Sequence, residues 1–398
     1  MNADLQKTPY YLFDEAECVN RTQKIKEEIA AWGGRICYAI KANPFLIPSL
    51  LHVIDKFEVC SPGELQICQK YGVPGDKILF SGVVKTKQDI MAALEYPVDV
   101  ITLESLTHWH YLKECLNERK EEFEKVKILP RLSSGAQFGM EEAQIYQILE
   151  EQTAMEQIVV EGIHYFTGTQ KKGNKYEKEL KVAAEFIENI RQKYEMDDCI
   201  LEYGPGLAVP YFVGDDFSNP FGLIRQMREH IKEAAYPFRI DVELGRYIAA
   251  SCGKYVTSIV DVKKADERNY CLIDGGIHHI NYYGSNMAMR TPMISHIKQN
   301  SDLAVDSREE ESQEYMVCGS LCTFADIVVR GMSLESPKIG DILVFENIGA
   351  YSITEGSYLF LSRDLPDIYL KTTGGKVVPL REGVSSYEIN SHKGMDFE

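Results

Sequence analysis

The sequence predicts a (β/α)8 barrel, similar to a TIM barrel, followed by an all-β domain. Runs typical of strands and helices alternate between residues 35 and 243, and their number and size are those of such a barrel. Beyond about residue 250 the β-type runs are short and separated by turns, with no long helix between them. The length of 398 residues is enough for a barrel and an added domain.

The first expected elements are a strand over 10–13 and a helix over about 14–31. The eight barrel strands are expected at 35–40, 57–60, 77–80, 98–102, 125–132, 158–163, 199–203 and 238–243. Helices are expected at 45–54, 63–70, 87–94, 106–116, 141–151, 178–194 and 220–235. Later strands are expected at 254–262, 270–273, 315–317, 327–329, 341–345 and 359–361.

This pattern divides the chain into two domains. We expect a barrel over residues 14–250. We expect a β-sandwich or β-barrel domain from 1–13 and 251–398, so that the N-terminal strand joins the second sheet.

Composition narrows the possible functions. The formal net charge of −17 argues against general binding to nucleic acid or to anionic membranes. No apolar run approaches a membrane span, and the N-terminus lacks a signal-peptide pattern. The ten cysteines are scattered, and Cys318 and Cys322 have no second metal-spaced pair nearby. We therefore expect a cytoplasmic protein with reduced thiols and no metal site.

The stretch Y-A-I-K-A-N at 38–43 brings Lys41 to the carboxyl end of a predicted buried strand. Barrels carry their chemistry at that end of the strands. A partly desolvated lysine there can act as a nucleophilic amine and form a Schiff base. The alternative is a lysine that only extends into solvent from a strand end.

Two further motifs end the seventh and eighth strands. The Gly204-Pro205-Gly206 turn lies where barrels often hold phosphate on backbone N–H groups, although most such turns only reverse the chain. In Glu243-Leu244-Gly245-Arg246, the carboxylate could keep a pyridinium nitrogen protonated and Arg246 could bind phosphate. An ordinary surface ion pair between Glu243 and Arg246 is the alternative.

The sixth strand ends in G-I-H-Y-F-T-G-T-Q at 162–170. An aromatic side chain here could stack on a planar cofactor, and Gly168 with Thr169 could contact phosphate. The alternative is packing of aromatic residues at the rim of the barrel.

Two motifs in the β domain are ambiguous by themselves. One is C-G-S-L-C-T-F-A-D at 318–326, in which the thiol of Cys322 and the carboxylate of Asp326 are four residues apart. Free buried cysteines, however, are usually inert. The pair His278-His279 suggests a metal, yet no third ligand is evident.

Taken in order, the motifs resemble the pyridoxal phosphate (PLP)-dependent amino-acid decarboxylases of the alanine-racemase-like fold. That family includes diaminopimelate, ornithine, arginine and carboxynorspermidine decarboxylases. The motifs are Y-A-I-K-A-N, F-E-V-C-S-P-G-E-L (57–65), R-L-S with Q-F-G (131–139), G-I-H with G-T-Q, Y-G-P-G-L, E-L-G-R, C-G-S-L-C with Asp326, and Gly349-Ala350-Tyr351. The resemblance covers nearly the whole chain.

The resemblance implies a role for each motif. Lys41 would hold PLP as an imine, Glu243 would pair with the ring nitrogen, and Cys322 would protonate the α-carbon after CO2 leaves. In this family that cysteine comes from the partner subunit of a homodimer, so the sites would be shared. The expected cofactor-binding residues are Lys41, Arg131, His164, Phe166, Gly168, Thr169, Gly204, Gly206, Glu243, Gly245, Arg246 and Tyr351. The expected substrate-binding residues are His278, Cys322, Thr323, Asp326 and Tyr351.

The sequence departs from the family pattern at three positions. Phe166 stands where the family usually stacks a histidine on the ring. E-L-G-R replaces the usual E-P-G-R, and Thr323 replaces the acidic residue that commonly follows the cysteine. The last change puts diaminopimelate in doubt as substrate. The histidine pair and the G-T-Q ending are more similar to a branch from biosynthetic gene clusters, which includes enzymes acting on carrier-protein-linked amino acids.

The leading hypothesis is a PLP-dependent carboxy-lyase of class EC 4.1.1 that acts on an amino acid or a derivative of one. One alternative is an amino-acid racemase on the same fold, which needs a tyrosine acid and an arginine at the ring nitrogen. The others are a PLP carrier without catalysis and a regulatory homologue. Glu243 and the C-G-S-L-C motif argue against the racemase, and the β domain argues against the carrier. The combination of Lys41, Glu243 and Cys322 argues against the regulatory homologue.

Overall fold

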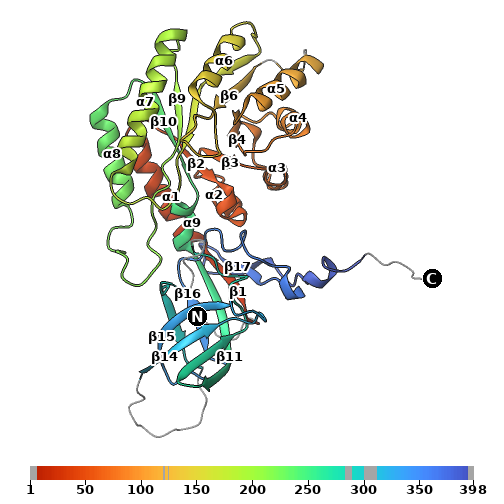
Figure 1. Cartoon of the computed structure of the whole chain (residues 1–398), viewed down its shortest axis with the longest axis vertical. Helices are drawn as coiled ribbons and strands as arrows, with labels where there is room; N and C mark the ends of the chain where they lie inside the picture. The colour runs from red at the N-terminus through yellow and green to blue at the C-terminus, as the bar shows by residue number, and fades with distance from the viewer. Residues whose placement is uncertain (1–6, 120–121, 124, 283–288, 300–311, 393–398) are drawn as a thin grey trace, which may run out of the picture. The chain divides into compact units, whose positions relative to one another are not determined.

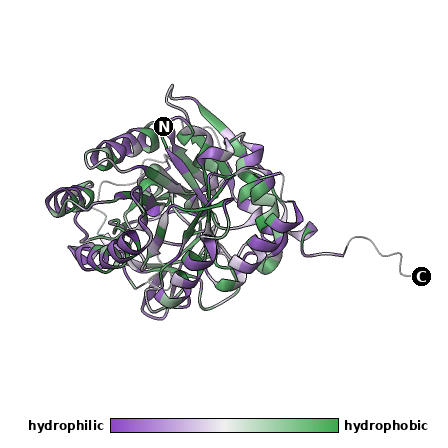
Figure 2. Cartoon of the chain, turned by 90° about the horizontal axis from the view of Figure 1, so that it is seen from above, coloured by the Kyte–Doolittle hydropathy of each residue, from purple (hydrophilic) through white to green (hydrophobic). Residues whose placement is uncertain are grey.

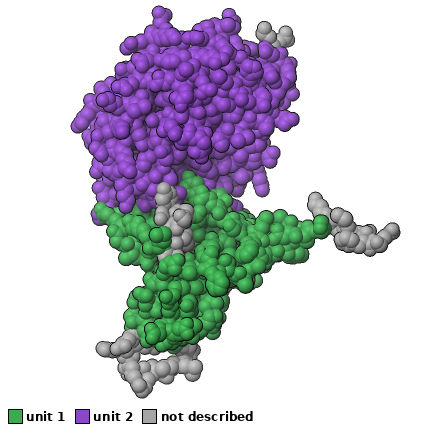
Figure 3. Space-filling model, viewed as in Figure 1, with its two compact units in different colours: residues 1–18, 210–217, 249–398 green, residues 19–209, 218–248 purple. Residues whose placement is uncertain are grey.

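The computed structural model describes residues 7–119, 122–123, 125–282, 289–299 and 312–392. The chain folds into two compact units, which Figure 3 colours separately. Unit 1 comprises Met1–Cys18, Pro210–Phe217 and Ala249–Glu398, and unit 2 comprises Val19–Val209 and Ser218–Ile248. No helix in the described ranges is long and apolar enough to cross a membrane. None of the ten cysteines, all of which lie in the described ranges, forms a disulfide.

Unit 2 is built on a parallel sheet in the order β7-β6-β5-β4-β3-β2-β10-β9-β8. Its strands are β2 (Ile36–Ala39), β3 (Lys56–Val59), β4 (Ile78–Phe80), β5 (Val100–Leu103), β6 (Val126–Pro130), β7 (Ile158–Val160), β8 (Gly162–Phe166), β9 (Ile200–Gly204) and β10 (Arg239–Leu244). An isolated parallel bridge between Arg131 and His164 joins the end of β6 to β8. The sheet therefore curls into the predicted barrel, and its strands deliver their carboxyl ends to one face.

The strand predicted over 158–163 is in fact two strands, β7 and β8. The chain bends at Gly162, whose φ is +149°. A Cβ atom there would lie 1.9 Å from the carbonyl oxygen of Ile200. Only glycine allows β8 to approach β9 this closely, and this pairing aims the end of β8 at the carboxyl face.

Helices follow the strands and surround the barrel (Figures 1 and 2). They are α1 (Glu15–Ala30), α2 (Ile47–Leu50), α3 (Pro62–Lys70), α4 (Lys87–Glu95), α5 (Leu106–Glu118), α6 (Glu142–Gln152), α7 (Lys175–Tyr194) and α8 (Gly222–Ala234). Ser61, Thr86 and Ser105 cap α3, α4 and α5 by accepting a backbone N–H from the first turn. The helix predicted over 45–54 is only α2, preceded by the 3-10 turn Pro44–Leu46.

Unit 1 contains a mixed sheet with the path β15-β14-β12-β11-β1-β17-β18, and β16 pairs with β11 and β13. The strands are β1 (Tyr10–Asp14), β11 (Gly253–Ala265), β12 (Arg268–Ile273), β13 (Ile294–Ile297), β14 (Ser312–Cys318), β15 (Ile327–Glu335), β16 (Ile342–Phe345), β17 (Asp367–Lys371) and β18 (Val377–Arg381). The N-terminal strand β1 joins this sheet, as predicted, because it lies antiparallel to β11 and parallel to β17.

One strand predicted for this unit is wrong. Residues 359–361 were expected to be extended, but Phe360–Ser362 form a 3-10 turn in which Leu361 has φ +61°. All three apolar side chains of 359–361 are exposed, so they do not provide the buried face that a strand needs. The sequence also missed β13, β17 and β18. β13 and β18 bury little of their surface, which leaves a weak hydrophobic pattern.

Candidate active site

Lys41 follows directly after β2, in the 3-10 turn Ile40–Ala42. Every residue of β2 is buried, which fixes the strand end. Asn43 holds the next turn: its side chain accepts the N–H of Phe45 at 3.1 Å, and its carbonyl accepts the Tyr38 hydroxyl at 2.9 Å. The Lys41 side chain is 44% exposed, so the sequence placed the amine correctly at an accessible strand end.

Two side chains from the β3 region contact the Lys41 amine. Nζ lies 3.2 and 3.0 Å from the two oxygens of Glu58 and 3.3 Å from Sγ of Cys60. The Cys60 thiol also donates to Glu58 at 2.7 Å. Burial, followed by the charge of Glu58, raises the pKa of the Cys60 thiol well above its ordinary value, so the thiol keeps its proton. Glu58 is therefore an acceptor shared by an amine and a thiol.

Arg131 is buried beyond the end of β6 and pairs with Glu104, at 2.6 Å between Nη1 and Oε1. The second oxygen of Glu104 accepts the N–H of Gly139 at 3.0 Å. The Arg131 guanidinium lies over the rings of Phe138 and Phe166, at 5.0 and 5.8 Å from their centroids. These contacts fix a cation beside the aromatic face that β8 presents.

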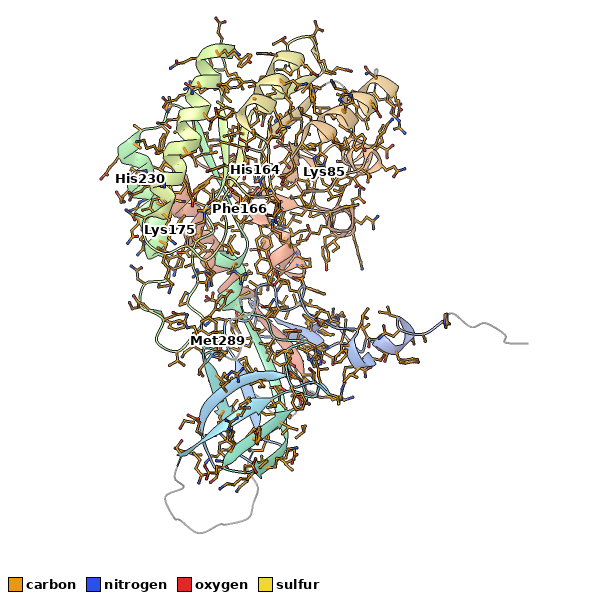
Figure 4. The ribbon with its side chains drawn as sticks, viewed as in Figure 1. Lys85, His164, Phe166, Lys175, His230 and Met289 are labelled. Atoms are coloured by element: carbon orange, nitrogen blue, oxygen red, sulfur yellow. The ribbon has the colours of Figure 1, made fainter. Side chains whose placement is uncertain are left out.

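Glu243 is buried on β10 and lies close to His164 of β8, with 3.1 Å between Oε1 and Nε2. The two atoms are close but not aligned as a hydrogen bond, so Oε1 lacks a donor among the described residues. Burial alone would raise the pKa of Glu243, but interactions with His164, Lys41 and Arg131 lower it below its ordinary value. Glu243 is therefore a buried carboxylate that stays ionised. His164 and Phe166 are labelled in Figure 4.

A second buried carboxyl group, Glu202, lies on the neighbouring strand β9. Neither of its oxygens has a hydrogen-bond partner in the described part of the chain. Burial raises the pKa of Glu202 well above its ordinary value, and the charges of Glu243 and Asp241 raise it further. The environment therefore shifts the pKa values of these two neighbours in opposite directions. It favours the protonated form of Glu202 and the ionised form of Glu243.

Two glycine turns lie side by side after β8 and β9. The N–H of Lys171 donates to Gly206 at 2.9 Å, and the N–H of Ala208 donates to Lys171 at 3.0 Å. Gly206 has φ +56°, and a Cβ atom there would lie 1.9 Å from the Gly168 carbonyl oxygen. A Cβ on Gly204 would lie 2.4 Å from the ring of Phe166. Backbone can therefore approach a ligand closely at the point where the sequence predicted phosphate binding.

The remaining residues expected near the phosphate lie close to these turns or to Lys41. Thr169 follows Gly168 in the first turn. Gly245 directly follows β10 and packs against the turn that contains Lys41, because a Cβ atom on Gly245 would lie 3.0 Å from Cβ of Ala42. Arg246 is buried at the start of the short helix α9 (Arg246–Ala249).

These residues fit PLP. The buried oxygen of Glu243 that lacks a donor suits a protonated ring nitrogen, and Phe166 offers an aromatic face. Nε of Arg131 also has no hydrogen-bond partner among the described residues, which leaves a donor for a ligand. The turns at Gly168 and Gly206 suit a phosphate group.

In unit 1, Cys322 lies in the loop between β14 and β15 and is exposed. Asp326 shapes that loop, because its carboxylate accepts the N–H groups of Ile277 at 2.8 Å and Leu321 at 2.7 Å. Thr323 accepts the N–H of Ala325 at 3.3 Å. Contacts of these three residues with substrate stay predictions.

The other two expected residues of unit 1 lie in different surroundings. His278 is buried against His279, at 3.7 Å between ring centroids, and its nitrogens have no hydrogen-bond partner among the described residues. Tyr351 has φ +68°, a strained conformation for a tyrosine, and its carbonyl accepts the N–H groups of Thr354 and Glu355 at 2.8 Å. Among the described residues no group of three or more histidine, cysteine or acidic side chains could hold a metal ion.

Sequence reasoning missed Glu58, Cys60, Glu104 and Lys85. The first two lie in the motif F-E-V-C-S, where alternation along a strand followed by a turn could have suggested that both face Lys41. Lys85, also labelled in Figure 4, is buried, and its Nζ donates to the Gly82 carbonyl at 2.5 Å. Burial lowers the pKa of Lys85 to about 8. Glu104 carries no local signal, because its role depends on a partner 27 residues away.

Comparisons with known proteins identify the family of this chain. The family model described as the pyridoxal-binding domain of pyridoxal-dependent decarboxylases matches residues 15–250. The chain is 25% identical to the L-glutamyl-[BtrI acyl-carrier protein] decarboxylase of Niallia circulans, over 95% of this chain and 92% of that protein. It is 26% identical to the diaminopimelate decarboxylase of Campylobacter jejuni, over 88% and 87% of the two chains.

Solved structures share the fold. The diaminopimelate decarboxylase of Helicobacter pylori, complexed with L-lysine, superposes with a TM-score of 0.82 at 20% identity and 96% coverage of both chains. The diaminopimelate decarboxylase of Methanocaldococcus jannaschii gives a TM-score of 0.84 at 20% identity, covering 98% of this chain and 93% of that one.

Proposed function

This chain belongs to the family of pyridoxal-dependent decarboxylases, and from that premise we propose how its residues divide the work of releasing CO2 from an amino acid. It is a PLP-dependent carboxy-lyase that acts on an amino acid or a derivative of one. This division of roles rests on one observation: an accessible lysine, Lys41, lies at one strand end, and a buried, ionised carboxylate, Glu243, lies at another.

Lys41 would hold the cofactor covalently through Nζ. Glu58 positions that nitrogen at 3.0 Å and can accept the proton that the ammonium must lose before it attacks a carbonyl. The Cys60 thiol keeps its proton and donates a hydrogen bond to Glu58, which fixes the carboxylate.

Glu243 would accept a hydrogen bond from the ring nitrogen and keep it protonated. When bound, PLP supplies an electron sink for the charge left on the α-carbon as CO2 departs. Arg131 is held by Glu104 next to Phe166, so a positive charge and an aromatic face would orient the ring. The turns at Gly168, Gly204 and Gly206, together with Arg246, would hold the phosphate. A carboxylate at the ring nitrogen also argues against the racemase alternative, which expects an arginine there.

Cys322 would return a proton to the α-carbon, and it would do so across the interface of a homodimer. Two exposed side chains of one loop in unit 1 support this part of the proposal. Cys322 is exposed, and the phenyl ring of Phe324, two residues further along the loop, is fully exposed. An exposed aromatic ring near the proposed proton donor suits a loop that a second subunit covers.

The substrate would be an amino acid, free or linked to a carrier protein. The similarity to an enzyme named for a glutamyl-carrier protein supports the second possibility, and the similarity to diaminopimelate decarboxylases supports the first. Ten cysteines that form no disulfide support a location in the reducing cytoplasm.

A CO2-release screen tests the activity directly. The purified protein should show a visible absorption band from bound PLP and release CO2 from at least one member of a panel of free and carrier-linked amino acids. A cofactor-loaded protein that inverts the α-centre of the same substrates without releasing CO2 would support a racemase instead. Bound cofactor with neither reaction would support a carrier or a regulator.

The shared site predicts complementation between two inactive variants. Lys41→Ala and Cys322→Ala subunits each lack one essential group, but a mixed dimer contains one site with both defects and one with neither. Subunit exchange should therefore restore up to about half of the activity per mixed dimer, by counting sites under two-fold symmetry. Exchange is followed with a mass tag. If tagged mixed dimers form and remain inactive, the thiol acts within its own chain or takes no part in the reaction.

A further inference from the structure

A hollow of about 400 Å³ in unit 1 adjoins the proposed proton donor. Val260, Leu272 and Ile273 form an apolar part of its wall, and Cys322 lies on its rim with Arg363. Because Cys322 is proposed to act at the α-carbon, a hollow beside it has the right position for the end of the substrate that is distal to that carbon. The charges in this hollow then decide which distal groups it can accept.

The carboxylate that lines the hollow, Asp274, is already occupied. Its Oδ1 accepts the hydroxyl of Thr257 at 2.5 Å and the N–H of Ser258 at 3.0 Å. Its Oδ2 accepts the hydroxyl of Thr8 at 2.5 Å. A carboxylate with three donors gains little from a substrate ammonium group, because these hydrogen bonds already satisfy it.

The other nearby candidates for binding a cation are also unsuitable. Asp326 is buried and uses one oxygen for the N–H of Ile277 and the other for the N–H of Leu321. Burial raises the pKa of Asp326, which further weakens it as a partner for a positive charge. Thr323, next to Cys322, carries no charge. Among the described residues that line the hollow, no carboxylate is left free to bind a distal ammonium group.

Arg363 supplies the opposite charge. It is exposed, and one of its terminal nitrogens, Nη2, donates to the Ser320 carbonyl at 2.9 Å, which holds the guanidinium at the hollow. Burial, and then the positive charge of Arg363, lower the pKa of His278 to about 4. His278 is therefore neutral at pH 7, and Arg363 is the cation among the described residues that line the hollow.

We propose that this hollow binds the distal end of the substrate and that Arg363 selects an anionic group there. That group is either a side-chain carboxylate or the phosphate of a carrier-bound arm, since a guanidinium binds both through the same charge-assisted hydrogen bonds. The inference rests on the proposed role of Cys322 in decarboxylation. It makes a basic amino acid with a distal ammonium group a poor substrate, because Arg363 would repel that group.

The test measures kcat and KM for CO2 release by the PLP-loaded enzyme. Five probes are compared: L-glutamate, L-norvaline with its uncharged side chain, L-lysine, and glutamate as a thioester on a pantetheine arm, once with and once without the phosphate of that arm. Wild type should prefer an anionic probe to L-lysine. Arg363→Gln should lower kcat/KM for that probe about tenfold to a hundredfold, mainly through KM, as expected for loss of a charged hydrogen bond. Arg363→Glu should shift the preference towards L-lysine.

The two sources of the anion give different patterns. If Arg363→Gln affects free L-glutamate, the guanidinium binds a side-chain carboxylate. If it affects only the thioester that carries the phosphate, the guanidinium binds the carrier arm. In the first case glutarate, which cannot react, should inhibit wild type competitively and inhibit Arg363→Gln more weakly.

Two variants control for indirect effects. Arg363→Gln keeps a donor for the Ser320 carbonyl, whereas Arg363→Met removes it. If position 363 only anchors the loop, kcat should fall for all probes in Arg363→Met and stay unchanged in Arg363→Gln. Arg330→Gln removes an exposed arginine of β15 outside the hollow and should change nothing. The inference is overturned if wild type prefers L-lysine, or if Arg363→Gln and Arg363→Glu leave the order of the probes unchanged. Bound cofactor without CO2 release from any amino acid would instead contradict the proposed function, and this inference with it.

Discussion

Replacing Lys41 with alanine is expected to abolish covalent attachment of PLP and to lower CO2 release by about 10³-fold or more, as for loss of a covalent catalytic group. The physical reason is that the Lys41 amine lies at an accessible strand end, 3.0 Å from the carboxylate of Glu58. Borohydride reduction followed by peptide mass spectrometry measures the attachment. Wild type should carry the reduced cofactor on Lys41.

Arginine at position 41 is the matched control. It keeps a positive charge for Glu58, which is buried and would otherwise be left without its cation. Lys41→Arg should therefore fold as stably as wild type and still fail to attach the cofactor. If reduction labels Lys85 or another lysine in wild type, the assignment of Lys41 is wrong.

Glu243→Gln should lower kcat by about 10²- to 10⁴-fold while PLP stays bound, as expected when a preorganised charge at the reacting system is lost. The interactions with His164, Lys41 and Arg131 keep Glu243 ionised in spite of its burial. Glutamine has nearly the same shape but no negative charge, so the ring nitrogen would lose its proton. The absorption spectrum of the bound cofactor and single-turnover CO2 release measure the two effects separately.

Glu202→Gln is the control for this substitution. Glu202 lies on the adjacent strand and is fully buried, and burial raises its pKa well above its ordinary value, which favours the protonated acid. An amide in place of this group should therefore change the rate little. Near-normal turnover in Glu243→Gln, or an equal loss in Glu202→Gln, would contradict the role given to Glu243.

The parts of this site that follow from local sequence were predictable. A buried run that ends in a lysine, and a glycine turn after a strand, each reflect a constraint within a few residues, so the positions of Lys41 and Gly206 could be expected. The alternation of strands and helices likewise indicated a barrel. The break at Gly162 was not visible, because it depends on how closely β8 approaches the Ile200 carbonyl.

The contacts that join distant segments could not be predicted in the same way. Glu104 is recognisable only through Arg131, and Asp274 only through hydroxyl groups on two other strands or loops. The same limit applies to Leu361, whose apolar run favours a strand until its exposure and left-handed backbone are known. Sequence patterns therefore indicated the candidate reactive groups better than the residues that position them or limit what they can bind.

The position of β1 has a consequence for biosynthesis. This strand is synthesised before both of its neighbours, because its antiparallel neighbour β11 begins at Gly253 and its parallel neighbour β17 begins at Asp367. At a translation rate of roughly 5–20 residues per second, β17 follows β1 by roughly 20 to 70 s. For that time the hydrogen-bonding groups along one edge of β1 lack their final partner, so β1 completes its pairing only after β17 has been made. The nascent protein must keep this exposed strand edge from pairing with other strands until then.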